Sequence, residues 1–272
     1  MPLVPSFVTV FAMLADVLTI DPSGVDAVVF DIGGVFTIRH HEVIGGALRQ
    51  AGFEVPEGPA AYHRAHYDAV GAMSDLLKTQ SRVNEYEPQL ALVWERGYLR
   101  SLGVPEARMD RAVRTVAALL DGRATHTVSC QILDENVVAF HRIVAAGIPV
   151  GIVSNNNGTA EAQLKILGIC QAGPGPLPSV TIVVDSNVVG HSKPDPAIFA
   201  PALEALGTDP ARTLYVGDTV HADVHGAQAA GMQVVQLDPY DLHTDFAHLR
   251  LPTVTVLADL LLNHSGQTLG LT

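Results

Sequence analysis

The chain has 272 residues, enough for one large domain or two smaller ones. Hydrophobic residues make up 48% and charged residues 16%, which predicts a sizeable buried core and excludes widespread disorder. The formal net charge is -12 and no basic tract offsets it, so neither nucleic acid nor an anionic membrane is an expected partner. The two cysteines, Cys130 and Cys170, have the spacing of neither a metal site nor a disulfide framework, and we expect a cytoplasmic location.

Residues 1–22 are predicted to form an N-terminal extension. Its apolar part, residues 3–20, is similar to a secretion signal in hydrophobicity, but no Lys or Arg precedes Arg39 and Asp16 interrupts the run. The same stretch contains Pro5 and is too polar for a membrane span. We expect it to pack on the body or at a subunit contact, so a homodimer is one expected assembly.

The first strand signal is the run Val28, Val29, Phe30, which is followed by Asp31 and then by Gly33 and Gly34. A short run of β-branched and aromatic residues is typical of a strand buried on both faces. Ligands of an open parallel sheet bind outside the carboxyl ends of its strands. A carboxylate at that end is therefore either a cap for the next segment or a reactive group.

Residues 41–123 are predicted to be helical throughout. Apolar residues recur in it at spacings of three and four. One helix is predicted over 42–51, a second begins at Pro88, and a third runs from Pro105 and ends at Asp121 and Gly122. No strand-like run interrupts this segment. It reads as a helical insertion between the first strand and the remaining chain.

From Asp134 onward, helices alternate with short apolar strands. The helices are predicted over 134–146, 159–167, 196–206 and 222–230, and the strands over 148–153, 180–184, 213–216 and 233–237. Strands that alternate with helices of about ten residues predict an α/β fold with a doubly wound parallel sheet.

Polar residues follow three of these strands. Ser154 precedes Asn155 at a helix start, where a hydroxyl and backbone amides form a phosphate cradle. Lys193, one of only three lysines, lies between a strand and a helix. Asp218 ends a strand and Asp223 follows it by five residues. Taken alone, each carboxylate fits a helix cap, as Ser154 does. Two carboxylates beside Asp31 would repel unless a hard cation or Lys193 neutralises them, and Mg²⁺ fits because it binds through few carboxylates.

These motifs resemble those of the haloacid dehalogenase (HAD) superfamily, in its helical-capped, phosphatase-like branch. The resemblance rests on Asp31, on Ser154, on Lys193 within Lys-Pro-Asp-Pro, and on Gly-Asp-Thr through Asp223, and it covers residues 25–237. It implies a Rossmann-like core of residues 23–40 and 124–272. Residues 41–123 would be an inserted, all-helical cap.

By that resemblance, Asp31 would be a nucleophile that takes a phosphoryl group from a small phosphorylated metabolite. Ser154, Asn155 and Lys193 would bind the phosphoryl group, with Ser154 and Lys193 offsetting its charge during transfer. The Mg²⁺ ligands would be Asp31, the backbone carbonyl of Gly33, and Asp218. Asp223 would support the metal through water or orient Lys193.

Gly33 departs from the family pattern, because phosphatases of the family usually carry a second Asp at this position. That Asp protonates the leaving group and activates water, and its loss predicts weakened or specialised hydrolysis. The histidines at 40, 41, 191 and 221 are candidate substitutes. His63 and His66 are expected to line the cap rather than bind a metal, and Trp94 and Tyr98 to lie in its core.

The leading hypothesis is a Mg²⁺-dependent phosphomonoesterase. One alternative is a metal-free 2-haloacid dehalogenase, which uses the same nucleophile, although Asp218 and Asp223 would overload a metal-free site with negative charge. A second alternative is a binding or regulatory protein that kept the phosphate pocket and lost turnover.

Overall fold

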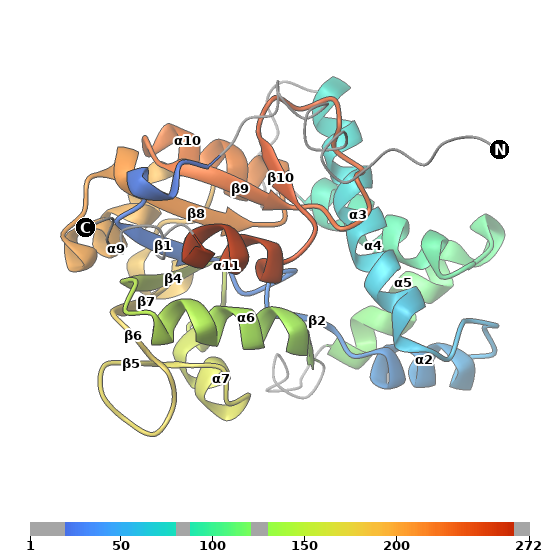
Figure 1. Cartoon of the computed structure of the whole chain (residues 1–272). Coiled ribbons are helices and arrows are strands. Elements are labelled where there is room, and N and C mark those ends of the chain that lie inside the picture. The colour runs from blue at the N-terminus through green and yellow to red at the C-terminus, as the bar shows by residue number, and fades with distance from the viewer. Residues whose placement is uncertain (1–19, 80–87, 121–129, 264–272) are drawn as a thin grey trace, which may run out of the picture.

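A six-stranded parallel sheet forms the centre of the computed structural model, which describes residues 20–79, 88–120 and 130–263 (Figure 1). Most of the predicted N-terminal extension and the predicted helix stop at Asp121 and Gly122 lie outside these residues. The strand order is β10-β9-β8-β1-β4-β7. The strands are β1 (Ala27–Phe30), β4 (Val150–Ser154), β7 (Ile182–Asp185), β8 (Thr213–Gly217), β9 (Gln233–Leu237) and β10 (Leu249–Leu251).

Strand β1 lies in the interior of this sheet, and all four of its residues are buried. It pairs in parallel with β4 and β8, with Phe30 opposite Ile152 on one side and Val216 on the other. This register brings the residues that follow β1, β4 and β8 to one edge of the sheet.

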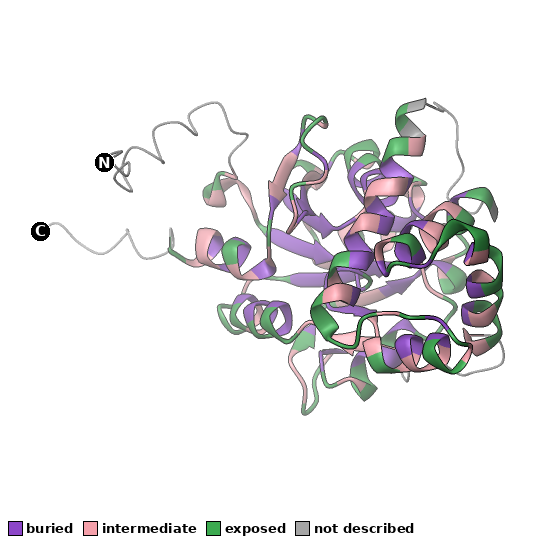
Figure 2. Cartoon of the chain, turned by 90° about the vertical axis from the view of Figure 1, so that its right-hand side faces the viewer, coloured by how far each residue is buried: buried purple, intermediate pink, exposed green. Residues whose placement is uncertain are grey.

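Helices cover both faces of the sheet, which confirms the predicted α/β class. Val28 and Phe30 of β1 point into one hydrophobic cluster, shared with α6 (Asp134–Ala145) and α11 (Val254–Asn263). Val29 points into a second cluster, shared with α9 (Ala200–Leu206) and α10 (Gly226–Ala229). This alternation follows from the two-residue period of a strand. Figure 2 shows the strands buried and the outer faces of the helices exposed.

The helical block, residues 41–120, has a hydrophobic core of its own. Its buried residues include Ile44 and Leu48, which are four apart, and Tyr98 and Leu102, which are also four apart. Tyr98 is fully buried and Trp94 packs against the same cluster, as predicted. The helices are α2 (His41–Gln50), α3 (Pro59–Thr79), α4 (Pro88–Ser101) and α5 (Met109–Leu120).

Two short strands that the sequence analysis did not predict flank the helical block. Strand β2 (Thr37–Arg39) pairs antiparallel with β3 (Cys130–Ile132), so the chain leaves and re-enters the core at one place. Three-residue strands contain too few residues to show a period. Strand β10 and helix α11 also lie beyond the last predicted element.

Several predicted elements have different bounds or geometry. The predicted strand 180–184 is divided into β6 (Ser179–Val180), which pairs with β5 (Gln171–Ala172), and β7. The predicted helix 222–230 begins as a wide, π-type turn over Val220–His225 before α10. The predicted helix 196–206 begins as a 3₁₀ turn over Pro196–Phe199 before α9. Two further short helices, α7 (Ala160–Ile166) and α8 (Ser186–Val189), follow β4 and β7.

Within the described ranges, none of the helices combines the length and the apolar character needed to cross a bilayer.

Candidate active site

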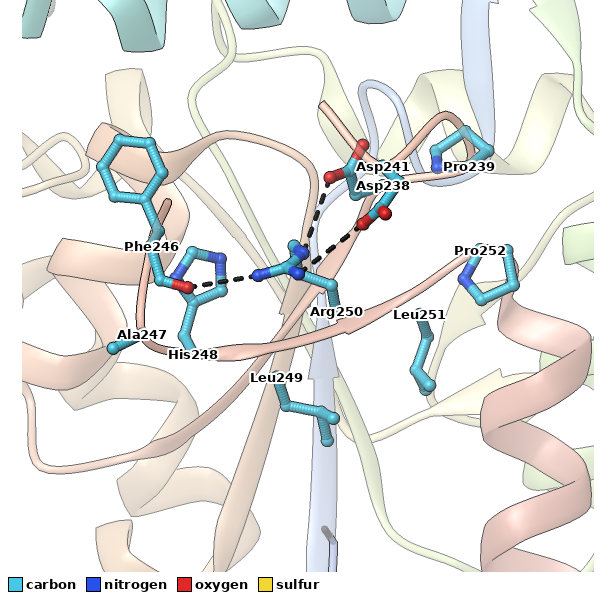
Figure 3. Close-up of a pocket in the computed structure, with 10 residues that line it drawn as sticks. All are labelled: Asp238, Pro239, Asp241, Phe246, Ala247, His248, Leu249, Arg250, Leu251 and Pro252. Carbon is cyan, nitrogen blue, oxygen red and sulfur yellow. Dashed lines mark hydrogen bonds and ion pairs between the residues drawn. The ribbon is translucent and has the colours of Figure 1, made fainter. Parts of the chain in front are cut away.

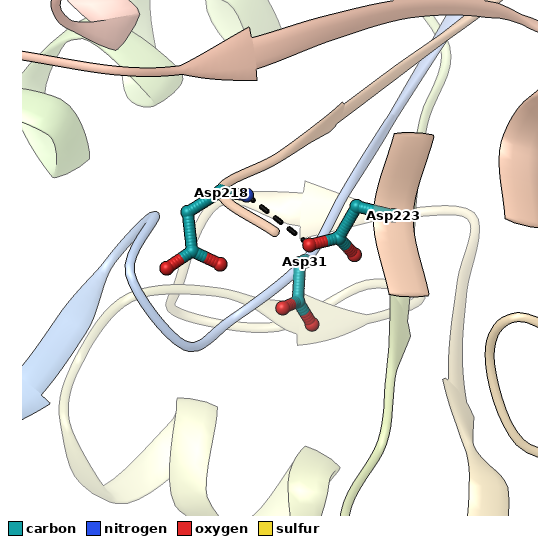
Figure 4. A group of neighbouring side chains, drawn as sticks. All are labelled: Asp31, Asp218 and Asp223. Carbon is teal, nitrogen blue, oxygen red and sulfur yellow. Dashed lines mark hydrogen bonds between the residues drawn. The ribbon is translucent and has the colours of Figure 1, made fainter. Parts of the chain in front are cut away.

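Three carboxylates meet at the edge of the sheet where β1 and β8 end (Figure 4). Asp31 follows β1, Asp218 follows β8, and Asp223 lies in the turn Val220–His225. One oxygen of each lies within 4.8 Å of one oxygen of each of the others, and all three residues are buried. The structure thus brings together three of the four predicted metal ligands by their side chains.

Glycines allow the loops around this cluster to approach each other. Gly34 has φ +65°, and a Cβ there would lie 2.0 Å from Asp218 Oδ2. A Cβ on Gly217 would lie 2.3 Å from the carboxyl carbon of Asp223. Gly33 differs, because a Cβ there would meet nothing within 4 Å. A side chain would therefore clash with the carboxylates at Gly34 and Gly217, whereas Gly33 has room for one.

Asp223 is held from several directions. Its Oδ2 accepts hydrogen bonds from the backbone N–H of Asp218 at 3.2 Å and from the Thr219 hydroxyl at 2.7 Å. Its Oδ1 lies 2.6 Å from Lys193 Nζ and accepts a hydrogen bond from the Tyr215 hydroxyl at 2.9 Å. Asp223 consequently fixes both the loop after β8 and the ammonium group of Lys193.

Lys193 supplies the positive charge of the cluster. Its Nζ lies 3.0 Å from Asp31 Oδ1 and donates to the Tyr215 hydroxyl at 2.9 Å, and the residue is only 2% exposed. The Asn155 side chain clamps the backbone of Lys193: its amide donates to Lys193 O at 3.0 Å and its oxygen accepts from Lys193 N at 2.8 Å. The side chain of Asn155 thus positions Lys193, a role that the sequence analysis did not assign to it.

Burial and charge move the pKa values of the two carboxyls beside Lys193 in opposite directions. Burial raises the pKa of Asp31 to about 6, against the attraction of Lys193. Burial also acts to raise the pKa of Asp223, but Lys193 and the hydrogen bonds from Thr219 outweigh it and hold that pKa below its ordinary value. At neutral pH both groups are predominantly ionised carboxylates.

This donor set fits a hard divalent cation. Three carboxylates face one ammonium group, so a negative charge remains uncompensated in a buried place. Lys193 forms an ion pair with the buried Asp31 Oδ1, and the same ammonium group is also paired with Asp223. Carboxylate and carbonyl oxygens are the ligands that Mg²⁺ prefers. Asp31, Gly33, Asp218 and Asp223 are the residues that would hold it.

Ser154 ends β4 opposite Asp185 and is buried beside this edge of the sheet. Asp185 accepts hydrogen bonds from the backbone N–H groups of Gly158 and Ala160, at 2.9 and 3.0 Å, and of Asn187 at 2.9 Å. One carboxylate therefore shapes the loop after Ser154 and the start of α7. The sequence predicts a phosphate cradle in this loop, and that assignment stays a prediction.

His66 is the histidine that the structure brings to the carboxylates. Its Nε2 lies 2.8 Å from Asp218 Oδ2, and the next residue, Tyr67, donates its hydroxyl to Gly34 O at 2.7 Å. Both residues belong to α3 of the helical block. From the sequence, His66 is expected to line the cap, and no motif includes Tyr67. Only the three-residue spacing of His63 and His66 marked this face of the helix.

The histidines proposed as substitute acids have other contacts. His40 caps α2 by accepting from the backbone N–H of Glu42, and His41 Nδ1 lies 2.7 Å from Gln131 Oε1. His191 is exposed and its Nδ1 lies 2.9 Å from Asp195 Oδ2. The ring of His221 packs edge-on against His225.

A separate pocket of about 470 Å³ lies beside β10 (Figure 3). Arg250, which lines it, donates to Phe246 O at 3.1 Å and lies 3.5 Å from Asp241 and 3.7 Å from Asp238. The positive charge of Arg250 is therefore already matched by two carboxylates of the same pocket. The carboxylate cluster at the end of β1 is the stronger candidate for chemistry.

Comparison with solved structures shows the same fold. A HAD phosphatase from Thermococcus onnurineus aligns with a TM-score of 0.51 and 20% identity, covering 87% of this chain and 97% of that one. A HAD-hydrolase from Bacillus subtilis, solved bound to magnesium, aligns with a TM-score of 0.54 and 15% identity over 88% and 99% of the two chains.

Comparison with curated proteins gives partial matches. The mouse haloacid dehalogenase-like hydrolase domain-containing protein 3 is 32% identical over 133 residues, and the match spans about half of each chain (49%). The phosphoserine phosphatase of Thermus thermophilus is 38% identical over 82 residues, 30% of this chain and 31% of that protein.

The family model described as haloacid dehalogenase-like hydrolase matches residues 25–231, the span from β1 to the end of α10. This span contains Asp31, Ser154, Lys193, Asp218 and Asp223, and it confirms the resemblance on which the sequence analysis relied. The chain belongs to the haloacid dehalogenase-like hydrolase family.

Proposed function

We propose that this protein is a Mg²⁺-dependent phosphomonoesterase that acts on a small phosphorylated metabolite. The observation that carries the proposal is the contact of Lys193 with Asp31 inside the cluster of three carboxylates. A nucleophilic carboxylate beside an ammonium group and a cation site suits an anionic phosphoryl group. Relatives named as phosphatases support the reaction class.

In the proposed reaction, an oxygen of Asp31 attacks phosphorus and the P–O bond to the leaving group breaks. The leaving group departs as an alkoxide or phenoxide and takes its proton from water. Lys193 and the hydroxyl of Ser154 bind the phosphoryl oxygens, while Asn155 keeps the Lys193 loop in position through its side chain. When bound, Mg²⁺ supplies charge stabilisation to the phosphoryl group. Water then attacks phosphorus of the aspartyl-phosphate, the P–O bond to Asp31 breaks, and inorganic phosphate leaves with the carboxylate restored.

Gly33 limits this chemistry. It offers a backbone carbonyl to the metal but has no side chain to protonate a leaving group. Positioned acid-base catalysis contributes about 10²–10⁴-fold. We therefore propose that aryl or anomeric phosphates, whose leaving groups need little protonation, are better substrates than simple alkyl phosphates.

The same proposal divides the chain into three parts. Residues 41–123 would act as a cap that chooses the substrate and excludes water, and residues 23–40 with 124–272 would form the catalytic core. Residues 1–22 would be an extension outside the site. The helical block has its own hydrophobic cluster, which supports this division.

A panel of small phosphate esters assayed with Mg²⁺ tests the function. The wild type should release phosphate from at least one class of ester, and Asp31→Asn should remove that activity because it removes the nucleophile. Activity in Asp31→Asn equal to that of the wild type would contradict the assignment of the nucleophile.

Two further results would favour the alternatives. Chloride release from 2-chloropropionate that persists in EDTA would favour the dehalogenase. Tight binding of a phosphate ester without turnover by the Mg²⁺-loaded protein would favour the binding protein.

A further inference from the structure

Helix α3 reaches both of the loops that carry the proposed metal ligands. His66 Nε2 lies 2.8 Å from Asp218 Oδ2, in the loop after β8. The Tyr67 hydroxyl donates to Gly34 O at 2.7 Å, in the loop after β1. Adjacent residues of a helix point about 100° apart, so neighbouring positions can contact two different loops. Together they bridge the two sides of the carboxylate cluster.

These two contacts are buried and their geometry is constrained. His66 is 9% exposed and Tyr67 is 2% exposed. The His66 ring packs edge-to-face against Trp94 at 5.7 Å and against Tyr67 at 5.1 Å between ring centroids. These rings limit the rotation of the imidazole, and its Nε2 is therefore held toward Asp218.

The direction of the hydrogen bond follows from its partners. An ionised carboxylate only accepts hydrogen bonds, so Nε2 of His66 carries the proton that it shares with Asp218. Nε2 is a donor both in the charged imidazole and in the neutral tautomer that is protonated at Nε2. The hydrogen bond uses one lone pair of Asp218 Oδ2 and leaves the other lone pairs of this carboxylate available to a cation.

We propose that His66 and Tyr67 are positioning residues of the Mg²⁺ site, an inference that rests on the proposed function. His66 orients the Asp218 carboxylate, and Tyr67 holds the loop of Asp31 and Gly33 against the same helix. Hydrogen-bond partners of metal ligands orient those ligands, and their loss typically lowers metal affinity about 10–100-fold. Here the partners come from the helical block, so metal binding and the docking of α3 are linked. By thermodynamic reciprocity, Mg²⁺ then strengthens the docking of α3 as much as that docking strengthens Mg²⁺ binding.

Calorimetric titration of the full chain with Mg²⁺ tests the proposal. We expect His66→Ala to weaken Mg²⁺ binding about 10-fold or more. His66→Gln, whose amide can donate at a similar position, should recover most of the affinity. Tyr67→Phe should weaken binding less than His66→Ala, since Gly34 is not itself a proposed ligand.

His63→Ala is the matched control. His63 lies one turn earlier on α3 and also bridges to the core, with Nδ1 2.8 Å from the Tyr240 hydroxyl, but Tyr240 belongs to the loop after β9. Loss of a contact that only holds the helical block would affect His63→Ala and His66→Ala alike. We expect the Mg²⁺ affinity of His63→Ala to stay within about twofold of the wild-type value. This change is much smaller than the loss of about 10–100-fold that follows removal of a metal ligand's hydrogen-bond partner.

Hydrogen exchange of the α3 amides gives a second measurement that needs no turnover. Mg²⁺ should slow exchange along α3 in the wild type and have a smaller effect in His66→Ala. Equal Mg²⁺ affinity in the wild type and in folded His66→Ala would overturn the proposal, and so would tighter binding in His66→Ala. A wild type that does not bind Mg²⁺ would remove the metal from the proposed function and this inference with it.

Discussion

Gly33 and Gly34 follow the same strand but meet opposite constraints. A Cβ on Gly33 has open space, and its φ lies outside the left-handed region, so a side chain fits there. A Cβ on Gly34 would overlap Asp218, and its φ of +65° strains any other residue. The two positions therefore form a matched pair for mutation.

We predict that Gly33→Asp folds normally and hydrolyses alkyl phosphates faster, because it adds an acid beside the leaving group. A gain of about 10-fold or more is expected, below the full 10²–10⁴-fold of an optimised acid. The gain should be smaller for aryl phosphates. Steady-state assays on both ester classes measure it, and unchanged rates on both would show that another group already serves as the acid.

Gly34→Ala should instead destabilise the protein by at least about 1–2 kcal/mol, from the left-handed backbone alone. It should also weaken Mg²⁺ binding by displacing Asp218. Urea denaturation and calorimetry check the two effects, with Gly33→Ala as the control that should change neither.

A buried histidine predicts a pH dependence of stability. Burial lowers the pKa of His248 to about 4, and its Nε2 lies 2.6 Å from Gln236 Oε1. Because the folded pKa lies below the unfolded value, the stabilisation is complete above about pH 6.5 and is lost as the pH falls toward 4. At pH 5 this loss amounts to about 2 kcal/mol.

Urea denaturation at pH 7 and pH 5 measures this loss. His248→Gln should show a smaller fall in the free energy of unfolding between the two pH values than the wild type. The exposed residue His191 provides the control, because His191→Gln should reproduce the wild-type fall. An identical fall in His248→Gln and the wild type would assign the pH dependence to other groups.

Among the elements, α3 contacts the segment 238–248 as well as the loops after β1 and β8. Ser74 Oγ lies 3.0 Å from His243 Nε2 in a buried contact. One turn later, Lys78 Nζ lies 2.9 Å from Asp245 Oδ2 at an exposed position. The two contacts join the same helix to the same segment, one as a buried hydrogen bond and the other as an exposed ion pair.

We predict that Ser74→Ala costs about 1–3 kcal/mol, because it leaves the buried Nε2 of His243 without its partner. Lys78→Ala should change stability little, because solvent and ions screen an exposed pair. Urea denaturation of the two variants under identical conditions checks the difference. Equal losses in the two variants would show that burial does not decide the strength of these contacts.

At the scale of the whole molecule, the charge cluster predicts stabilisation by metal. A ligand that binds only the native state at 100 times its Kd adds about 2.7 kcal/mol. For a chain of this size, the expected rise in Tm is about 5–10 °C. Thermal unfolding with Mg²⁺ and with EDTA measures it.

Asp218→Asn supplies the control, since it removes one proposed ligand and should abolish most of the Mg²⁺-dependent rise. The same rise in Asp218→Asn as in the wild type would place the metal elsewhere. A phosphatase activity that survives complete chelation would also contradict the assignment of Mg²⁺.

Local sequence patterns were sufficient to predict the α/β class and the polar residues at the edge of the sheet. Strands such as β1, β4 and β8 carry apolar runs that only a doubly covered sheet can bury. Ser154 is the last residue of β4, and Asp31 and Asp218 directly follow β1 and β8. Because the carboxyl ends of parallel strands share one edge of a sheet, the position of each polar residue at the end of its strand was enough to place all three at that edge. These features could be predicted because each apolar run and the polar residue at its end lie within a few consecutive residues.

The tertiary structure alone decided which residues from elsewhere complete the site. His66 and Tyr67 lie on a helix whose periodicity shows a buried face but not what that face contacts. No sequence pattern indicated that the Asn155 side chain hydrogen-bonds the backbone of Lys193. Strands β2 and β3 are 90 residues apart and three residues long, so no local period could reveal their pairing. Contacts between segments distant in sequence depend on how the helical block docks on the sheet, which no local pattern encodes.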